Sequence, residues 1–421
     1  MGRKTFFDMC PGFAATLRGM GLYGDSLVIE GTSLGAKLKI AGIKDPVTSW
    51  ISLDYLGLGD YEPIRENAIG HVKKYGTGFA SSRVIMDTSI HQELEACLAD
   101  FKGVPRGCCL LVNTGYAANS MLISMLVADM RVANKRIKDK PRTLIFKDAL
   151  THASIIEATL YQENNGKNET INFPHLDYDM LEQKLEEYKH IDADKYIVTD
   201  SLFSMNGSFA DIRRIYELAE QFSAFIVLDN AHSDGTYGEE GRGLLYLNDG
   251  VKSLPKDIFL ETGTLSKSVC CIGGYMTLTK DLCELARVSQ WPYIFSVGLP
   301  TFLVATICDT ISIIRGPEGD RRRKNLHQNS IRLLKLLKEN GFNTLNSESH
   351  IIPIVIGKET KCLEVQEYLL NKFNMMVGAV RFPAVKRGEA ILRIPITASH
   401  VEDDIASLHK ALVMAKDKFN F

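Results

Sequence analysis

The segment Glu261-Thr-Gly-Thr-Leu-Ser-Lys267-Ser decides the fold of this chain when it is read together with Asp229-Asn-Ala-His232 upstream. The apolar residues 224–228 predict a buried strand that ends in the carboxylate of Asp229. Residues 257–260 predict the next strand, which runs into a loop that presents Lys267. Because functional side chains of parallel sheets gather at the carboxyl ends of the strands, we expect Asp229 and Lys267 to lie close together.

This pair of side chains suits a cofactor that needs both a carboxylate and an amine. The aspartate can keep a pyridinium nitrogen protonated, and the lysine can form an imine with an aldehyde. Pyridoxal 5'-phosphate (PLP) carries both groups. The pair therefore indicates a PLP site.

The order of predicted elements places this site in an α/β protein. Strand and helix patterns alternate from about residue 60 to 300, which is typical of a mainly parallel central sheet covered by helices. After Pro300 the pattern changes to an α+β arrangement. We therefore predict an N-terminal arm (residues 1–60), a large PLP-binding domain (61–300) and a smaller C-terminal domain (301–421).

Composition argues against several other classes of protein. Of the 421 residues, 49 are Lys or Arg and 51 are Asp or Glu, and the net charge of −2 gives no sign of nucleic-acid binding. No apolar stretch is long enough for a membrane span. The nine cysteines show no C-x-x-C spacing, so neither a metal site nor a disulfide framework is expected. A cytoplasmic protein without metal follows from these observations.

Several further motifs stand in one consistent order between about residues 52 and 410. They are Asn113-Thr-Gly115-Tyr116-Ala-Ala-Asn119, Leu150-Thr-His152-Ala-Ser, Thr199-Asp-Ser-Leu-Phe-Ser204-Met, Asp229-Asn-Ala-His232, Thr264-Leu-Ser-Lys267 and Leu392-Arg393-Ile-Pro-Ile-Thr-Ala-Ser-His400. Together they resemble the α-oxoamine synthase family of fold-type I PLP-dependent enzymes. The resemblance implies the fold-type I architecture and PLP as the cofactor.

The resemblance also implies roles for individual residues. Lys267 would hold PLP as an imine and move the proton at the substrate Cα. Asp229 would bind the pyridine nitrogen, and His152 would stack on the ring. The remaining cofactor contacts would come from the phenolic-oxygen partner His232, the phosphate-binding Thr264, the loop residues Gly115 and Tyr116, and Ser204 beside the cofactor oxygen or imine.

Other positions concern the substrates and the partner subunit. Arg393 would clamp the substrate carboxylate, since a guanidinium suits bidentate binding. Ser296 would reach the phosphate of the partner subunit's cofactor, although Val297 and Gly298 replace the family's usual polar pair. Leu53 replaces an asparagine that helps to bind the carboxylate.

Two more departures from the family pattern concern the size and charge of single side chains. Phe79 and Ala80 add bulk in a glycine-rich loop, and Asn230 stands where the family has an acid. We interpret the changes at Leu53, Phe79 and Ala80 as an altered substrate pocket in an active enzyme.

The implied activity is a decarboxylating Claisen condensation of a small amino acid (alanine, serine or glycine) with an acyl-CoA. The products would be an α-aminoketone, CoA and CO2, formed in a homodimer with active sites at its interface. Two alternatives stay open on the residues: a fold-type I aminotransferase, and a catalytically silent partner subunit of a synthase. The motif residues decide neither the amino acid nor the length of the acyl chain.

Overall fold

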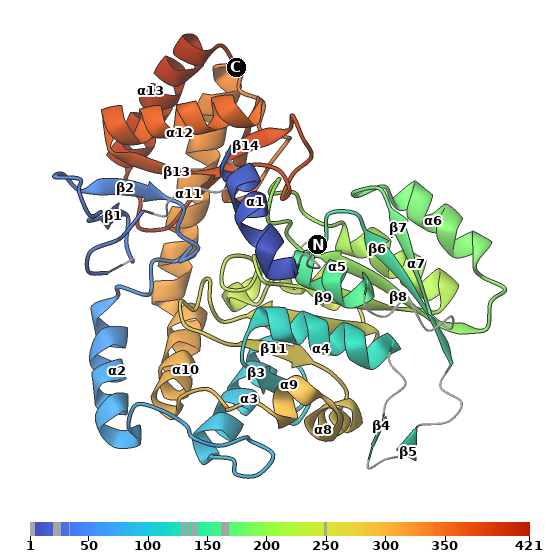
Figure 1. Cartoon of the computed structure of the whole chain (residues 1–421). Helices are drawn as coiled ribbons and strands as arrows, with labels where there is room; N and C mark the ends of the chain where they lie inside the picture. The colour runs from blue at the N-terminus through green and yellow to red at the C-terminus, as the bar shows by residue number, and fades with distance from the viewer. Residues whose placement is uncertain are drawn as a thin grey trace.

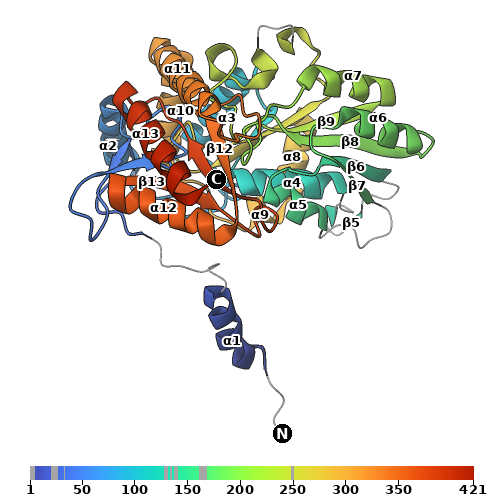
Figure 2. The same cartoon turned by 90° about the horizontal axis from the view of Figure 1, so that it is seen from above.

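The computed structural model of the chain describes residues 5–19, 27–32, 34–127, 131–132, 135–136, 141–160, 168–247 and 251–421. Its first helix, α1 (Phe6–Gly19), has no buried residue and stands apart from the rest of the chain in Figure 2. The remaining described residues form two main sheets and the helices that cover them (Figure 1). A separate two-stranded ribbon pairs β4 (Arg131–Val132) with β5 (Lys135–Arg136).

The larger sheet has seven strands in the order β3-β11-β10-β9-β8-β6-β7. Their bounds are β3 (Cys109–Val112), β6 (Arg142–Asp148), β7 (Glu169–Phe173), β8 (Ala193–Asp200), β9 (Ala224–Asp229), β10 (Phe259–Thr264) and β11 (Gly274–Thr277). Only β11 runs antiparallel to its neighbours among these strands. The predicted mainly parallel sheet is confirmed.

Alternate side chains of these strands pack into two separate cores. On β9, Ile226 and Leu228 join the core under α6 (Tyr178–Glu187) and α7 (Ile212–Phe222). Val227 points into the opposite core, under α4 (Gly115–Val127), α5 (Ala153–Leu160) and α8 (Lys280–Ser289). Figure 2 shows the central strands between these two helical layers. Both faces of the sheet are buried, which explains the continuous apolar runs of the strands.

The smaller sheet has five strands in the order β1-β2-β13-β14-β12. They are β1 (Lys37–Leu38), β2 (Val47–Trp50), β12 (Ile351–Gly357), β13 (Met375–Val380) and β14 (Ala390–Pro395). The helices α12 (Glu359–Phe373) and α13 (Glu402–Phe419) complete this part of the chain. The strand β2 of the predicted arm thus pairs with the C-terminal strand β13, and the division at residues 60 and 300 stays a prediction.

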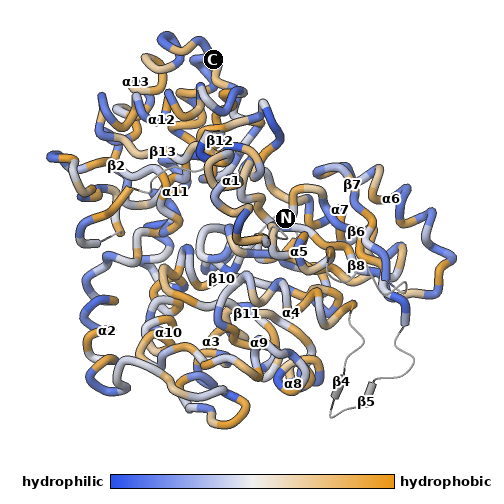
Figure 3. Tube along the Cα trace, viewed as in Figure 1, coloured by the Kyte–Doolittle hydropathy of each residue, from blue (hydrophilic) through white to orange (hydrophobic). Residues whose placement is uncertain are grey.

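Two consecutive helices link the two sheets. α10 (Thr301–Arg315) packs against α2 (Glu62–Tyr75) and α3 (Ser89–Lys102), and α11 (Pro317–Glu339) continues toward the smaller sheet (Figure 1). In Figure 3, α10 is mostly hydrophobic and α2 more hydrophilic, as expected for a buried helix beside a surface helix. A short helix, α9 (Trp291–Ile294), precedes α10, and the described elements also include 3-10 turns at Glu239–Gly241, Leu244–Tyr246 and Val251–Ser253.

Candidate active site

The site lies at the carboxyl ends of three adjacent parallel strands. Asp200 ends β8 and pairs in register with Asp229, which ends β9. The neighbouring β10 ends at Thr264, and the loop between β10 and β11 carries Lys267. This is the arrangement predicted for Asp229 and Lys267 from their places after two buried strands.

Backbone hydrogen bonds close the loop that carries Lys267. The Leu265 amide donates to the Gly273 carbonyl (3.0 Å), and the Cys270 amide donates to the carbonyl of Lys267 itself (2.8 Å). Burial lowers the pKa of Lys267 to about 8, although the charge of Asp229 acts in the opposite direction. The amine is therefore neutral in a substantial fraction of molecules near pH 8, whereas an ordinary lysine is not.

Asp229 is fixed by two donors. Its Oδ2 accepts from Asn119 Nδ2 (2.7 Å), and its Oδ1 accepts from the Ala231 amide (2.8 Å). The side chain is almost fully buried. Asp200, beside it, has a pKa raised well above the ordinary value by burial and by the charge of Asp229. Asp229 has a side-chain donor and a backbone donor, whereas among the described residues Asp200 accepts only from the His152 amide (3.3 Å).

His152 belongs to the same hydrogen-bonded group. Its Nδ1 lies 2.7 Å from Ser154 Oγ, and that hydroxyl also accepts from Asn119 Nδ2 (2.9 Å). The Ser154 amide also donates to Nδ1 (3.3 Å), so the ring proton belongs on Nε2. Burial lowers the pKa of His152, which keeps the ring neutral and suited to stack on an aromatic ring.

His232 lies in the same buried space, next to Lys267 and Arg393. Its Nδ1 is 2.7 Å from the hydroxyl of Tyr55. Burial, together with the positive charges of Lys267 and Arg393, lowers the pKa of His232 well below its ordinary value. This ring is also neutral.

The start of α4 can bind an anion. Thr114 Oγ1 accepts from the Ala117 amide (3.0 Å), and the amides of Gly115 and Tyr116 have no acceptor within the helix. A Cβ atom on Gly115 would lie 2.7 Å from Cβ of Thr264, so glycine is needed for this close approach. The φ of Gly115 is not positive, so the close approach to Thr264, and not a left-handed backbone, is the reason for glycine here.

Arg393 reaches the site from β14 of the smaller sheet. Its Nε donates to the carbonyl oxygen of Ser204 (2.6 Å), which follows β8. The guanidinium also acts on Tyr55 through its charge and a side-chain hydrogen bond. Leu53 packs against the main hydrophobic core. The structure thus brings Arg393 near Lys267, and it places Ser204 against Arg393 through its carbonyl oxygen.

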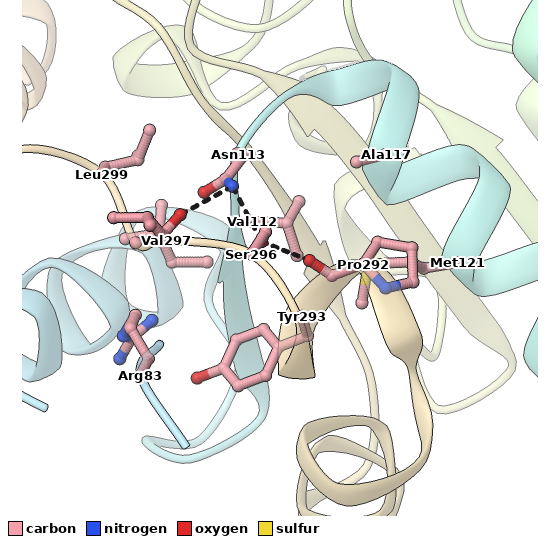
Figure 4. A pocket seen from close by; sticks show the side chains of 12 residues that line it. Arg83, Val112, Asn113, Ala117, Met121, Pro292, Tyr293, Ser296, Val297 and Leu299 are labelled. Atoms are coloured by element: carbon pink, nitrogen blue, oxygen red, sulfur yellow. Dashed lines mark hydrogen bonds between the residues drawn. The ribbon is translucent and has the colours of Figure 1, made fainter. Parts of the chain in front are cut away.

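Tyr116 and Ser296 lie further out. Tyr116 is 45% exposed and donates to the carboxylate of Glu157. Its ring and that of His152 are in an edge-to-face arrangement, with centroids 6.1 Å apart. Ser296 Oγ accepts from Asn113 Nδ2 (3.1 Å) and donates to the Pro292 carbonyl (Figure 4). Both residues stay predicted cofactor contacts.

Ser296 lines a pocket of about 200 Å³ beside α4, with Arg83, Asn113 and Tyr293 among its other walls (Figure 4). Lys267, Asp229 and His152 do not line this pocket. It is therefore separate from the strand-end site.

Two departures from the family pattern meet at this pocket. A Cβ atom on Gly298 would lie 2.8 Å from Cδ1 of Phe79 and 2.9 Å from Cγ of Arg83. The bulk gained at Phe79 thus occupies the space that a side chain at 298 would need. The sequence presented these as two separate changes, and only the structure shows that they are complementary.

Three residues of the site were given no role from the sequence. Tyr55 and His350 are fully buried next to His232 and Arg393, and Asn119 connects Asp229 with Ser154. Asn119 stands inside a quoted motif, which is the signal that could have marked it. Among the described residues no cluster of His, Cys, Asp or Glu could hold a metal ion, and no helix is long and apolar enough to cross a membrane.

Comparison with known proteins adds to this geometry. The aminotransferase class I and II family matches residues 64–412. The chain is 32% identical over 390 residues to 8-amino-7-oxononanoate synthase of Geobacter sulfurreducens, covering 92% of this chain and 93% of that protein. The Thermoanaerobacter pseudethanolicus enzyme of the same name is 33% identical over 405 residues, with 96% and 95% covered. A serine palmitoyltransferase structure from S. paucimobilis with bound PLP and myriocin has a TM-score of 0.85 at 25% identity, covering 99% and 100%.

Proposed function

Since this chain belongs to the α-oxoamine synthase family of fold-type I PLP-dependent enzymes, we propose that it condenses alanine, serine or glycine with an acyl-CoA. Loss of the amino-acid carboxylate as CO2 and release of CoA would leave an α-aminoketone. The family fixes PLP as the cofactor and acyl transfer as the class of reaction. The single observation that carries the substrate proposal is the meeting of Lys267, Asp229 and Arg393 in one buried site.

The side chains present fit PLP. A lysine with a lowered pKa, a carboxylate, a neutral ring and the free amides at the start of α4 match its aldehyde, ring nitrogen, ring face and phosphate. When bound, PLP supplies an aldehyde for amine capture and a ring that accepts electrons from the substrate Cα. We assign the ring nitrogen to Asp229, the ring face to His152 and the phosphate to Thr264 with the Gly115 and Tyr116 amides.

Lys267 would act as the proton carrier at the substrate Cα. Its pKa of about 8 lies near neutrality, so the amine can take a proton and return it at comparable cost. Asp229, fixed by Asn119 and the Ala231 amide, would keep a positive charge at the ring nitrogen throughout. Exclusion of water by the buried strand ends strengthens these charge interactions.

Arg393 would bind the carboxylate of the amino acid. Its Nε is already held by Ser204, which would leave the outer N–H groups for a bidentate contact with that carboxylate. Leu53 offers no second donor at the position where the family has asparagine. Arg393 would therefore carry more of the carboxylate binding than in relatives with that asparagine.

We also propose a homodimer in the cytoplasm. Ser296 would complete the phosphate site of the partner subunit, as the family motif implies, and Asn113 fixes its hydroxyl within this chain. The nine cysteines all lie in described residues and none forms a disulfide, in keeping with a reducing compartment.

A matrix of amino acids and acyl-CoAs tests the proposal. Glycine, alanine and serine are each combined with short and long acyl-CoAs, and the release of CoA and CO2 is measured. We expect CoA release with at least one pair, and Lys267→Ala should abolish it. Amino exchange with a keto acid and no CoA release would instead assign the chain to the aminotransferases. A wild-type rate in Lys267→Ala would refute the proton-transfer role.

A further inference from the structure

Tyr55 connects two groups of the site and has no assigned role. The residue follows β2, is fully buried, and accepts from the Ala398 amide through its carbonyl (2.8 Å). Its ring packs edge-on against His350, with centroids 4.1 Å apart. These contacts fix the phenol where it meets His232 on one side and Arg393 on the other.

The direction of the hydrogen bonds at this phenol follows from the donors available. Burial raises the pKa of Tyr55, so the hydroxyl keeps its proton. Arginine has no acceptor and can only donate to the phenol oxygen. The hydroxyl proton of Tyr55 must therefore go to Nδ1 of His232, 2.7 Å away.

That bond determines the tautomer of His232. A ring nitrogen that accepts a hydrogen bond carries no proton, and the lowered pKa of His232 excludes the doubly protonated ring. The single ring proton then lies on Nε2, and this nitrogen is a donor. An Nε2–H donor is what the phenolic oxygen of the cofactor requires if His232 binds that oxygen.

We propose that Tyr55 is a positioning residue that holds His232 in the Nε2–H tautomer and links its ring to Arg393. The proposal rests on the cofactor role suggested for His232. A substrate carboxylate that draws the guanidinium of Arg393 away from the phenol would alter the hydrogen bond received by His232. Binding of the amino acid would in this way change the electron distribution in the cofactor ring.

The wild-type apoenzyme gives the first test. ¹⁵N-labelled histidine NMR reports which ring nitrogen carries the proton, and the His232→Gln variant assigns the signal. We expect the Nε2–H tautomer across neutral pH. A proton on Nδ1 would overturn the proposal, and this measurement does not depend on the reaction or on whether Tyr55 variants fold.

Tyr55→Phe tests the consequence, with Tyr237→Phe as the matched control. Tyr237 also bonds a buried histidine, since its hydroxyl lies 3.3 Å from Nδ1 of His350. In Tyr55→Phe we expect a mixture of tautomers at His232, PLP binding weakened about tenfold, and a shifted pH dependence of the visible absorption of bound PLP. Tyr237→Phe should change PLP binding less than about twofold.

Two results would contradict the role of Tyr55. One is an unchanged His232 tautomer together with an unchanged absorption profile in Tyr55→Phe. The other is an equal loss of PLP binding in Tyr237→Phe, because the loss of any buried hydroxyl would then explain the result. Failure of the wild-type chain to bind PLP would refute the proposed function and leave the tautomer result standing.

Discussion

The contact between Phe79 and Gly298 can be tested by a double-mutant cycle. Gly298→Ala would place a Cβ atom 2.8 Å from the Phe79 ring, where ordinary contact begins at 3.4 Å, so about 0.6 Å of movement is needed. Arg83, the second neighbour, cannot yield easily because Asp87 and Glu95 hold its guanidinium. Overpacking of this kind costs about 1–3 kcal/mol.

The loss of backbone freedom in the unfolded chain offsets about 0.4–1 kcal/mol of that cost. We therefore expect Gly298→Ala to lower the free energy of unfolding by about 1–2 kcal/mol. Phe79→Ala opens the space, and in its presence Gly298→Ala should cost about 1 kcal/mol less. The contact of the added methyl group with Arg83 remains, so the relief is incomplete.

The assay is urea-induced unfolding of the apoprotein at one fixed protein concentration. Gly70→Ala serves as the control, because this glycine lies in α2 with no atom within 4 Å of an added Cβ, and alanine should stabilise the helix by about 1 kcal/mol. The complementary packing would be refuted if the effects of Phe79→Ala and Gly298→Ala on the free energy of unfolding add within about 0.5 kcal/mol. So would a gain in stability from Gly298→Ala equal to that of the control.

Three further outcomes are expected. The rate of PLP capture by the apoprotein should rise with pH through about 8, because only the neutral amine of Lys267 reacts. Asp229→Asn should move this pH profile to lower pH, because the charge of Asp229 raises the pKa of Lys267. Stopped-flow absorbance measures both. Asn119→Leu should destabilise the fold by about 1–3 kcal/mol and weaken PLP binding, since Asp229 loses a buried donor; a stable variant with unchanged affinity would contradict this. Lys102→Met should lower the free energy of unfolding in urea by about 3–5 kcal/mol, because the buried carboxylates of Asp234 and Glu261 lose their cation. Adding Glu261→Gln should recover part of that loss.

The local pattern of the sequence determined the catalytic edge of the large sheet. The predicted strand before Asp229 is β9, and the strand before Lys267 is β10, one position further along the sheet. Asp211 caps α7 as its position before an amphipathic run predicts, accepting from the Arg214 amide (3.0 Å). Such features depend on neighbours within a few residues, so spacing and residue type suffice to predict them.

The antiparallel strand β11 and the edge strand β7 were not predicted. Both are short, and their pairing depends on where the chain returns to the sheet and not on their own residues. The same holds for β2, whose partner β13 lies more than 300 residues away in the chain, and for β1, which pairs with β2.

Only the tertiary structure decided which side chains surround Lys267 besides the motif residues. Tyr55 follows β2 of the smaller sheet and bonds His232, which follows β9 of the large sheet, and the charge of Arg393 on β14 also acts on His232. No spacing in the sequence encodes that contact, because it depends on how the two sheets pack across α10 and α11. The lysine and the aspartate follow from the strands that carry them, whereas the surroundings that set the lysine pKa and the histidine tautomer follow from burial and contacts between distant segments.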